Sequence, residues 1–365
     1  MKITPISSWL PRHSHSNSPL VIAGPCSAES MEQVLTTAYA LKNIPEVKIF
    51  RAGIWKPRTR PNNFEGLGEI ALPWLAEVKK QTGLLTTTEV ATAKHVELCL
   101  EHGVDILWIG ARTTANPFSV QEIADALKGV DIPVMIKNPI NADLQLWIGA
   151  LERMNNAGLT KLIAIHRGFS VADKLEFRND PLWRIPMELK VKFPELPLLC
   201  DPSHITGERE LVQKVCQKAI DLNMNGLIIE THPDPNKAWS DAAQQITPEK
   251  LKVILSEISL KTEHSTNADF GLQLSIFRGQ IDRLDNELLH ILKLRTDIVE
   301  KIALAKSEQN ITALQRSRFD HLMKERLEAG KTLGLEESFI KEIFDSIHEQ
   351  SVKLQTDHFE SKKKN

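Results

Sequence analysis

Four residues of types that commonly bind metal ions are spread over the first 241 positions of the chain. Cys26, His204 and Glu230 come at the ends of different short apolar runs, and Asp241 follows the last of these runs. One thiolate, one imidazole and two carboxylates suit a borderline divalent metal, Mn, Fe, Co or Zn, better than Mg or Ca. Taken singly, Cys26 is more simply a small buried residue, and His204 a turn residue. Taken together, the four predict a metal site.

Cationic residues follow the same kind of apolar run. Lysines and arginines at a surface are usually only solvated, but these adjoin segments that must be buried. Cations held close together repel one another unless an anion joins them, and arginine suits phosphate and carboxylate groups. We therefore expect substrates with more than one phosphate or carboxylate. The cations are Arg51, Lys56, Arg58, Arg112, Lys137 and Arg167.

The elements that must position these residues repeat one theme, in which an apolar, β-rich run is followed by a helical pattern. Eight near-continuous apolar runs fit parallel strands buried on both faces. Eight strand–helix units over this length predict a (β/α)8 barrel, with a doubly wound sheet as the alternative. In a barrel, the residues after the strands converge on one site. The runs cover 19–26, 47–53, 83–90, 105–112, 132–139, 161–168, 196–204 and 226–233.

Length and composition are those of a soluble globular protein. The chain has 365 residues, of which 42% are hydrophobic and 25% are charged. A net charge of −2 gives no footprint for nucleic acid, and no run approaches the roughly 18 apolar residues of a membrane helix. Cys99, Cys200 and Cys216 are predicted to be structural. Few, scattered cysteines and an N-terminus without a signal-peptide core favour a cytoplasmic location.

Seven motifs occur in a fixed order within residues 18–258, and together they resemble the type I class of 3-deoxy-D-arabino-heptulosonate 7-phosphate (DAHP) synthases. The resemblance implies condensation of phosphoenolpyruvate with erythrose 4-phosphate and release of phosphate. It assigns Cys26, His204, Glu230 and Asp241 to one divalent metal per barrel. The motifs are GPCSAES, RAGIWKPRT, IGAR, the lysine of VMIKNP, HRG, DPSH and ETHPDPNKAWSD.

The same resemblance implies roles for the cations. It places Arg58 and Thr59 at the phosphate of the aldose. The metal would polarise the aldehyde oxygen, and the cations would stabilise the phosphate and any anion formed. Either Glu89 or Lys137 is expected to handle a proton. The residues implied around phosphoenolpyruvate are Arg51, Lys56, Arg112, Lys137 and Arg167.

Three features of the sequence bear on the comparison with these synthases. The related 3-deoxy-octulosonate 8-phosphate synthases share several motifs but typically have Asn-Arg-Thr-Ser where this chain has KPRT at 56–59. KPRT indicates erythrose 4-phosphate rather than arabinose 5-phosphate as the acceptor. Asn138 and Pro139 depart from the Arg-Gly of many relatives, which leaves the geometry of that loop open. Because the first predicted strand begins at residue 19, we expect no regulatory domain ahead of the barrel.

The composition changes after about residue 258, and prolines end at Pro248. We predict a barrel over 1–258, a polar linker over 259–269 and a helical domain over 270–365, with helices at about 270–307, 313–329 and 336–355. The first of these helices, about 55 Å long at 1.5 Å per residue, has one apolar stripe that it cannot bury alone, so a partner chain is expected. The stripe consists of Phe277, Ile281, Leu284, Leu288, Ile291, Ile298, Ile302 and Ala305.

Polar residues in this region have a regular spacing. Arg295 interrupts the apolar stripe, where a buried unpaired charge costs several kcal/mol, unless its stem packs there and its charged end reaches solvent. Lys306 lies about 20° around the helix from Arg295 and shares its face, whereas Arg278 lies about 100° away and would point to another site, such as one on a partner chain. Ser351 and Gln355, one turn apart, share a face of the last helix.

This spacing resembles the all-helical class of chorismate mutases over residues 270–356. The resemblance implies an intertwined dimer in which the arginine of the first helix crosses into the partner's site. The rearrangement of chorismate to prephenate needs no cofactor. It needs two carboxylates held in a compact conformer and donors at the ether oxygen. The implied substrate-binding residues are Arg278 and Arg295 for the carboxylates, Lys306 and Gln355 for the ether oxygen, and Arg318 and Ser351.

Two positions depart from that family's pattern. Phe319 stands where a glutamate usually follows the arginine, and Gln315 stands where an aspartate is common. The glutamate's implied role is to hold the substrate hydroxyl, so the affinity or rate of the mutase is expected to be altered.

The sequence therefore predicts a (β/α)8 TIM barrel with metal-dependent DAHP synthase activity, followed by an all-α, three-helix chorismate mutase domain that forms a homodimer or higher oligomer. The alternatives are an octulosonate synthase barrel, or a helical tail that is a non-catalytic dimerisation or allosteric module. Fusion of an early and a late enzyme suggests feedback control of the synthase by prephenate or chorismate. The substrates are small anions, with no nucleic acid or membrane partner.

Overall fold

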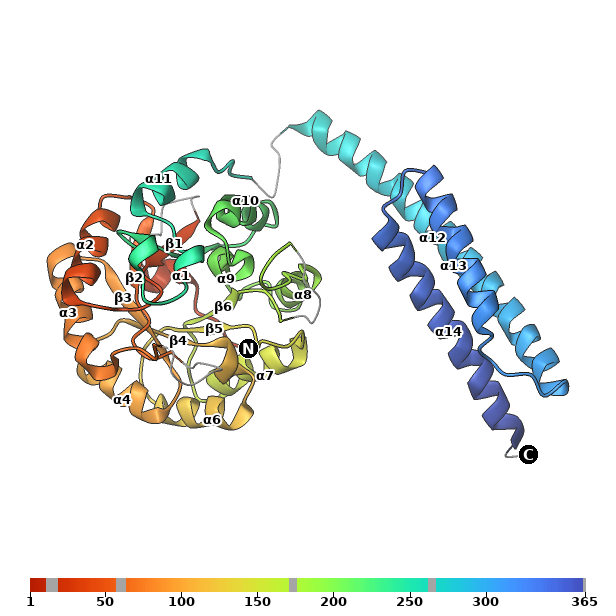
Figure 1. The fold of residues 1–365 in the computed structure, drawn as a ribbon, viewed down its shortest axis with the longest axis horizontal. Helices are drawn as coiled ribbons and strands as arrows, with labels where there is room; N and C mark the ends of the chain where they lie inside the picture. The colour runs from red at the N-terminus through yellow and green to blue at the C-terminus, as the bar shows by residue number, and fades with distance from the viewer. Residues whose placement is uncertain (11–18, 57–63, 171–175, 262–266, 364–365) are drawn as a thin grey trace. The chain divides into compact units, whose positions relative to one another are not determined.

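The computed structural model describes residues 1–10, 19–56, 64–170, 176–261 and 267–363. The chain forms two compact units, Met1–Glu263 and His264–Asn365 (Figure 1). The division falls inside the stretch predicted to be a linker. Each unit is described by itself.

The first unit is a closed barrel of eight parallel strands in sequential order. This confirms the predicted (β/α)8 fold and excludes the doubly wound sheet. The barrel closes where the last strand pairs with the first, with Glu230 opposite Gly24. The strands are β1 (Leu20–Gly24), β2 (Val47–Arg51), β3 (Leu85–Val90), β4 (Ile106–Ile109), β5 (Val134–Lys137), β6 (Leu162–His166), β7 (Leu198–Cys200) and β8 (Gly226–Glu230).

Helices alternate with the strands and cover the outside of the barrel (Figure 1). Two short helices lie directly after strands, α5 (Ala111–Thr114) after β4 and α9 (Pro202–Thr206) after β7. The covering helices are α2 (Met31–Leu41), α3 (Leu72–Thr82), α4 (Ala93–Glu101), α6 (Pro117–Ala126), α7 (Leu144–Asn156), α8 (Arg184–Lys192), α10 (Val212–Asp221) and α11 (Pro248–Glu257).

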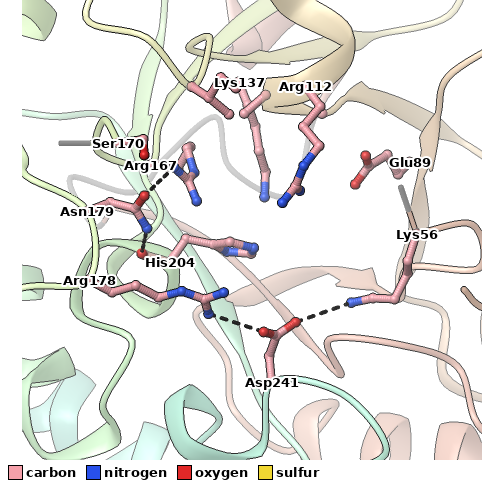
Figure 2. Close-up of a pocket in the computed structure, with 13 residues that line it drawn as sticks. Lys56, Glu89, Arg112, Lys137, Arg167, Ser170, Arg178, Asn179, His204 and Asp241 are labelled. Carbon is pink, nitrogen blue, oxygen red and sulfur yellow. Dashed lines mark hydrogen bonds and ion pairs between the residues drawn. The ribbon is translucent and has the colours of Figure 1, made fainter. Parts of the chain in front are cut away.

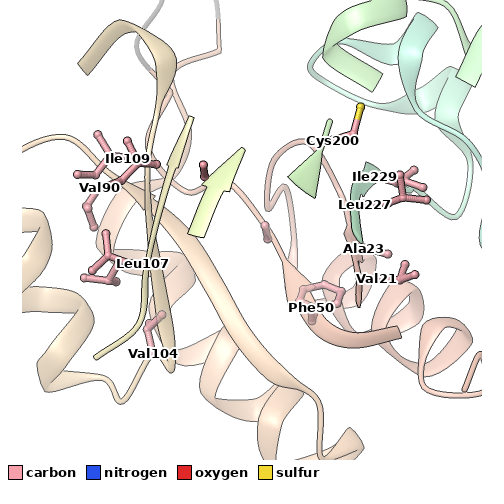
Figure 3. Close-up of a cluster of buried hydrophobic side chains, with 14 of the residues drawn as sticks. Val21, Ala23, Phe50, Val90, Val104, Leu107, Ile109, Cys200, Leu227 and Ile229 are labelled. Carbon is pink, nitrogen blue, oxygen red and sulfur yellow. The ribbon is translucent and has the colours of Figure 1, made fainter. Parts of the chain in front are cut away.

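The strands are apolar on both faces because each face is buried in a separate core. Outward side chains such as Val21, Phe50 and Leu227 pack in the layer between strands and helices (Figure 3). Inward side chains such as Ile22 and Trp108 fill the barrel itself. Side chains of successive residues point to opposite faces of a strand, so each strand contributes to both cores.

The amino-terminal end of the barrel interior is closed by the start of the chain. The short helix α1 (Ile6–Trp9) places Ile6 and Trp9 against the inner core, and Leu10 is buried there. The functional end is therefore the opposite one, where the strands end. Within the described residues, no helix combines the length and the apolar character needed to cross a bilayer.

The described part of the second unit consists of three helices, as predicted. They are α12 (Ala268–Glu308), α13 (Arg316–Thr332) and α14 (Glu337–Lys363), and α12 and α13 both contact α14. The observed α14 is longer than the predicted helix, which ended near residue 355. In the single chain most of the apolar stripe on α12 is open, with Leu284 63% exposed and Ile291 60% exposed.

Candidate active sites in the barrel and the helical unit

A cavity of about 470 Å³ lies at the carboxyl ends of the barrel strands. The structure brings together seven of the residues predicted for this site, and cationic side chains face it from several strands (Figure 2). These seven lining residues are Lys56, Glu89, Arg112, Lys137, Arg167, His204 and Asp241. Arg58 and Thr59, predicted at the aldose phosphate, lie outside the described residues.

Lys137, at the end of β5, is held by a buried carboxylate. Its Nζ lies 2.8 Å from Asp201 Oδ2, and Asp201 is fully buried after β7. Asp201 also caps α9 by accepting a hydrogen bond from the backbone N–H of His204, and its Oδ2 lies 2.9 Å from His204 Nδ1. Burial raises the pKa of Asp201, but the charges of His204 and Lys137 outweigh burial and hold the pKa well below its ordinary value. A single carboxylate therefore orients two predicted site residues.

Cys26 and Asp241 form a second contact group with Lys56. The Cys26 Sγ lies 3.3 Å from Asp241 Oδ2, and Lys56 Nζ lies 2.5 Å from the same sulfur. Lys56 also lies 3.9 Å from Asp241 Oδ2. Burial raises the pKa of the Cys26 thiol to about 12, and the charge of Glu230 adds to the rise, while the charge of Lys56 opposes it. The Cys26 side chain is thus a neutral thiol at neutral pH in the absence of a further cation.

Glu230, at the end of β8, is fully buried and paired. Arg51 Nη2 lies 3.1 Å from Glu230 Oε1, and the Arg51 guanidinium lies over the Trp108 ring, 5.0 Å from its centroid. Gln244 donates to the other carboxylate oxygen, Oε2, at 2.7 Å. Arg51 is 2% exposed and does not line the cavity, so it contributes charge from behind the cavity wall.

Arg178 was not among the sequence-predicted site residues, although it lines the cavity. Its Nη1 lies 3.1 Å from Asp241 Oδ1 and donates to Gln244 Oε1 at 2.8 Å. Burial raises the pKa of Asp241, but the charges of Lys56 and Arg178 help to hold it well below its ordinary value. Asp241 has a left-handed backbone conformation, with φ of 46°, which is uncommon for a residue other than glycine. Arg178 thus helps to fix a residue on a strained turn.

Two asparagines position Arg167. Arg167 Nη1 donates to Asn179 Oδ1 at 2.8 Å, and Asn179 donates to the backbone carbonyl of His204 at 2.6 Å. The backbone N–H of Arg167 donates to Asn138 Oδ1 at 2.7 Å, and Asn138 donates to the Gly168 carbonyl at 2.8 Å. Asn138, which differs from the residue of many relatives at this position, therefore joins the end of β5 to the end of β6. Burial lowers the pKa of Arg167 to about 10, which leaves it a cation at neutral pH.

Glu89 and Arg112 reach the cavity from β3 and from α5, which follows β4 (Figure 2). Glu89 Oε2 accepts a hydrogen bond from Trp108 Nε1 at 3.0 Å. A Cβ atom at Gly110 would lie 2.0 Å from Glu89 Oε1, so the glycine leaves the room that this carboxylate needs. Glu89 therefore lies against the wall of the cavity with one oxygen fixed.

The four predicted metal ligands come together from three strand ends, but their side chains contact protein partners. Among the described residues, no three His, Cys, Asp or Glu side chains take up an arrangement that could hold a metal ion. Lys56 and Arg178 contact Asp241, Arg51 contacts Glu230, and Asp201 contacts His204. Most of the side chains that contact the predicted metal ligands are therefore cations.

The helical unit brings together two of its predicted substrate-binding residues directly. Arg295 Nη1 donates to Ser351 Oγ at 2.6 Å, which joins α12 to α14. Lys306 donates to the backbone carbonyl of Ala313 at 2.7 Å. Gln355 is buried one turn after Ser351 and donates to the Ser351 carbonyl at 3.1 Å.

Arg278 and Arg318 are exposed in the single chain. Arg295 and Ser351, both predicted to bind chorismate, contact each other, and their roles stay predictions. Arg278 lies seventeen positions before Arg295 on the same long helix. Its placement toward a second chain remains a prediction.

Comparison with known proteins gives two family matches. Residues 12–266 match the DAHP synthetase I family, and residues 277–356 match chorismate mutase type II. A phospho-2-dehydro-3-deoxyheptonate aldolase of Thermotoga maritima is 34% identical over 238 residues, which cover 65% of this chain and 68% of that protein. A 2-dehydro-3-deoxyphosphooctonate aldolase of Caulobacter vibrioides is 25% identical over 255 residues, which cover 65% of this chain and 85% of that protein.

Solved structures give the same picture of the barrel. The crystal structure of the DAHP synthase of Thermotoga maritima superposes with a TM-score of 0.60 at 32% identity, covering 67% of this chain and 68% of that one. A truncated form of the synthase from the same organism gives a TM-score of 0.58 at 31% identity, covering 66% of this chain and 86% of that one.

Proposed function

The chain belongs to the DAHP synthetase I family and carries a chorismate mutase domain, and on this premise we propose that its barrel is a metal-dependent synthase that condenses phosphoenolpyruvate with erythrose 4-phosphate. The observation that supports this most is the cavity in which Lys56, Arg112, Lys137 and Arg167 face one space beside His204 and Asp241 (Figure 2). Several cations around one small cavity suit a substrate with both a carboxylate and a phosphate.

The cations and the carboxylates of the cavity take different parts. Arg112 and Arg167 bind and orient the anionic groups of phosphoenolpyruvate, because their planar guanidinium groups match oxyanions. The Lys137 ammonium, fixed by Asp201, stabilises negative charge that develops beside it. Glu89 is then the cavity carboxylate placed to accept a proton, since its anchored position beside Trp108 leaves it at the cavity wall.

The metal part of the proposal rests on the chemistry and spacing of the donors. Two ligands of one tetrahedral ion, with bonds of about 2.0–2.3 Å, lie about 3.5 Å apart, and Cys26 Sγ lies 3.3 Å from Asp241 Oδ2. His204 Nδ1 lies 2.9 Å from a carboxylate, the usual way in which a ligand histidine is oriented so that its other nitrogen faces a metal. Cys26, His204, Glu230 and Asp241 would hold Mn, Fe, Co or Zn. When bound, the ion would act as a Lewis acid on the aldehyde oxygen.

The acceptor sugar is the point that separates the two synthase classes. Relatives named as octonate aldolases share the barrel at 25–28% identity, below the 34% of the Thermotoga maritima heptonate aldolase. The deciding experiment supplies purified protein with phosphoenolpyruvate and a divalent metal, and with either erythrose 4-phosphate or arabinose 5-phosphate. Phosphate release with erythrose 4-phosphate alone is expected. Phosphate release with arabinose 5-phosphate but not with erythrose 4-phosphate would refute the assignment as a DAHP synthase.

For the helical unit we propose rearrangement of chorismate to prephenate. The supporting observation is the partly buried contact of Arg295 with Ser351, on the α12 face that also carries Lys306. These groups suit the carboxylates and the ether oxygen of chorismate. The test is loss of chorismate absorbance in the presence of the protein, without added metal. If this protein does not turn over chorismate but still binds it, the helical unit is a regulatory module instead.

We further propose that the helical unit forms a homodimer. A run of apolar side chains on one helix, more than half exposed at Ile281, Leu284 and Ile291, is a surface that soluble proteins normally cover. The covering partner would be the same helix of a second chain, which would also bring Arg278 to a site. Light scattering during gel filtration should give twice the chain mass of 41.1 kDa. The paired change Leu284→Glu and Ile291→Glu should reduce it to that of a monomer.

We also propose that prephenate or chorismate bound to the helical unit lowers synthase activity. The support is the joining of two enzymes that act at different points of aromatic biosynthesis in one chain. Synthase rates measured with saturating prephenate, and separately with saturating chorismate, test this directly. An unchanged rate would remove the proposal, and it would leave both catalytic assignments standing.

A further inference from the structure

His348 lies on the face of α14 that also carries Ser351 and Gln355. Its ring packs against Phe319 of α13, with ring centroids 4.2 Å apart and planes tilted by 34°. His348 Nε2 is shielded from solvent and has no hydrogen-bond partner among the described residues. A buried polar atom without a partner costs free energy. This nitrogen is therefore placed to bind a group that the single chain does not supply.

The surroundings of His348 define the kind of group it would bind. Burial lowers its pKa, and the charges of Arg295 and Lys306 lower it further, while Asp345 opposes them. The imidazole is therefore neutral at neutral pH, with one nitrogen that donates and one that accepts. Phe319 offers no hydrogen bond, and its ring fixes the plane of the imidazole. His348 is thus an oriented, neutral polar group near two cations.

The chemistry of chorismate divides between these groups. Its two carboxylates and its ether oxygen are matched by Arg295, Lys306 and the other cationic and amide groups of the site. Its ring hydroxyl is neutral and both donates and accepts, so a neutral imidazole is its natural partner. We infer that His348 Nε2 binds the ring hydroxyl of chorismate. This inference rests on the proposed mutase function, and it makes His348 a specificity-determining residue for that reaction.

The sharpest test compares two substrates in the full-length protein. His348→Phe keeps an aromatic ring against Phe319 and removes the polar atom, whereas His348→Gln keeps an amide at a similar reach. His358→Phe is the matched control, because His358 lies on the same helix and its Nε2 is also buried without a partner among the described residues. The substrates are chorismate and an analogue in which the ring hydroxyl is replaced by hydrogen.

We expect His348→Phe to lower kcat/KM for chorismate about tenfold, the usual loss for one buried hydrogen bond. The same change should alter kcat/KM for the deoxy analogue less than twofold. His348→Gln should recover part of the loss on chorismate, and His358→Phe should leave both substrates unchanged. An equal loss on both substrates would show a structural role and overturn the inference, as would no loss on chorismate.

Calorimetric binding of chorismate separates this inference from the proposed function. If the wild-type protein binds chorismate without turnover, the mutase proposal fails, and the tenfold weakening of binding by His348→Phe still tests the contact. If the wild-type protein neither binds nor converts chorismate, both fail together. If it converts chorismate and His348→Phe matches it on both substrates, the inference alone fails. Far-ultraviolet circular dichroism confirms that each variant is folded.

Discussion

Lys137 and Asp201 form a buried ion pair, with Lys137 Nζ 2.8 Å from Asp201 Oδ2, across the ends of strands β5 and β7. The same carboxylate caps α9 and lies 2.9 Å from His204 Nδ1. One acidic residue therefore contacts both the cationic Lys137 and the predicted metal ligand His204.

Replacing Asp201 tests that relationship. Asp201→Asn should lower the free energy of unfolding of the barrel by about 3 kcal/mol, because it leaves the buried Lys137 charge unpaired. All seven tryptophans lie before residue 264, so tryptophan fluorescence during urea unfolding reports the barrel alone. Asp131→Asn, which removes a surface partner of Lys161, is the control and should change stability by less than about 0.5 kcal/mol. Equal stability of the two variants would contradict the argument.

Removing the Lys137 charge should stop the synthase reaction and leave the chorismate mutase reaction unchanged. Lys137→Met is expected to reduce kcat at least about 100-fold, the usual effect of removing a charge that stabilises the transition state. Chorismate turnover in the same preparation should be unchanged, since Lys137 belongs to the first unit. Lys161→Met is the matched control at the surface.

Replacing Arg178 should weaken the binding of the metal and leave the binding of phosphoenolpyruvate unchanged. Arg178→Ala releases Asp241 Oδ1 and Gln244, and loss of such a supporting partner typically weakens metal binding about 10–100-fold. Synthase rates titrated with Mn²⁺ should show a higher half-saturating metal concentration. Lys237→Ala, which removes an exposed ion pair with Asp234 in the preceding loop, should not. A raised KM for phosphoenolpyruvate with unchanged metal dependence would assign Arg178 to the substrate instead.

Chelation should separate the two activities. EDTA is expected to abolish synthase activity and to leave chorismate turnover intact, because the mutase reaction requires charge and shape alone. Cys26→Ser should reproduce the loss of synthase activity in the presence of metal, and Cys99→Ser should retain it, since Cys99 is buried in α4 away from the strand ends. Equal loss of both activities in EDTA would be incompatible with a metal confined to the barrel.

Arg295 gives the corresponding test for the helical unit. Arg295→Ala should lower kcat for chorismate at least about 100-fold. The change removes the cation that would bind a carboxylate of chorismate, and it removes the hydrogen bond to Ser351. Arg316→Ala, at an exposed position whose ion pair with Asp320 is long at 3.9 Å, should behave like the wild type. Synthase activity without effector serves as the internal check on folding.

His166 should make the barrel less stable in mild acid. Burial lowers its pKa from 6.5 to about 3, and the charge of Arg167 adds to this shift. The unfolded chain therefore binds a proton at a pH where the folded chain does not, so stability falls as pH drops below about 6.5. The contribution of this group should fall by about 2 kcal/mol between pH 7 and pH 5. The His166 ring contacts Phe169 and Trp183, so a phenylalanine suits the same surroundings. His166→Phe should flatten the pH dependence of urea unfolding by that amount.

The architecture was predictable because the strands of this barrel are buried on both faces. Runs such as residues 161–168 contain inward Ile163 and Ile165 as well as outward Leu162 and Ala164, which produces a continuous apolar run instead of alternation. The ends of those runs also located the cavity residues Lys137 and Arg167. Periodicity likewise predicted the three helices of the second unit.

The supporting residues were harder to predict, because their roles depend on contacts between distant segments. Asn138 binds the backbone N–H of Arg167 and Asn179 binds its guanidinium. Arg178 joins the loop after β6 to the loop after β8. No apolar run or motif marks Arg178 in the sequence. Asp201 follows the seventh apolar run and precedes Pro-Ser-His, which is typical of a helix cap, but its contacts with Lys137 and His204 depend on the folded chain.

The contacts of Lys56 with Cys26 and Asp241 have a consequence for how a divalent ion would enter the barrel. The Lys56 ammonium contacts two of the proposed ligands, Cys26 and Asp241. A divalent ion that binds these ligands must therefore displace the ammonium from them. Uptake would then exchange a tethered monovalent cation for a divalent one, and release of the Cys26 thiol proton would offset the added charge. The tethered ammonium would act as a built-in placeholder, so that loading and unloading of the ion need not unfold the barrel.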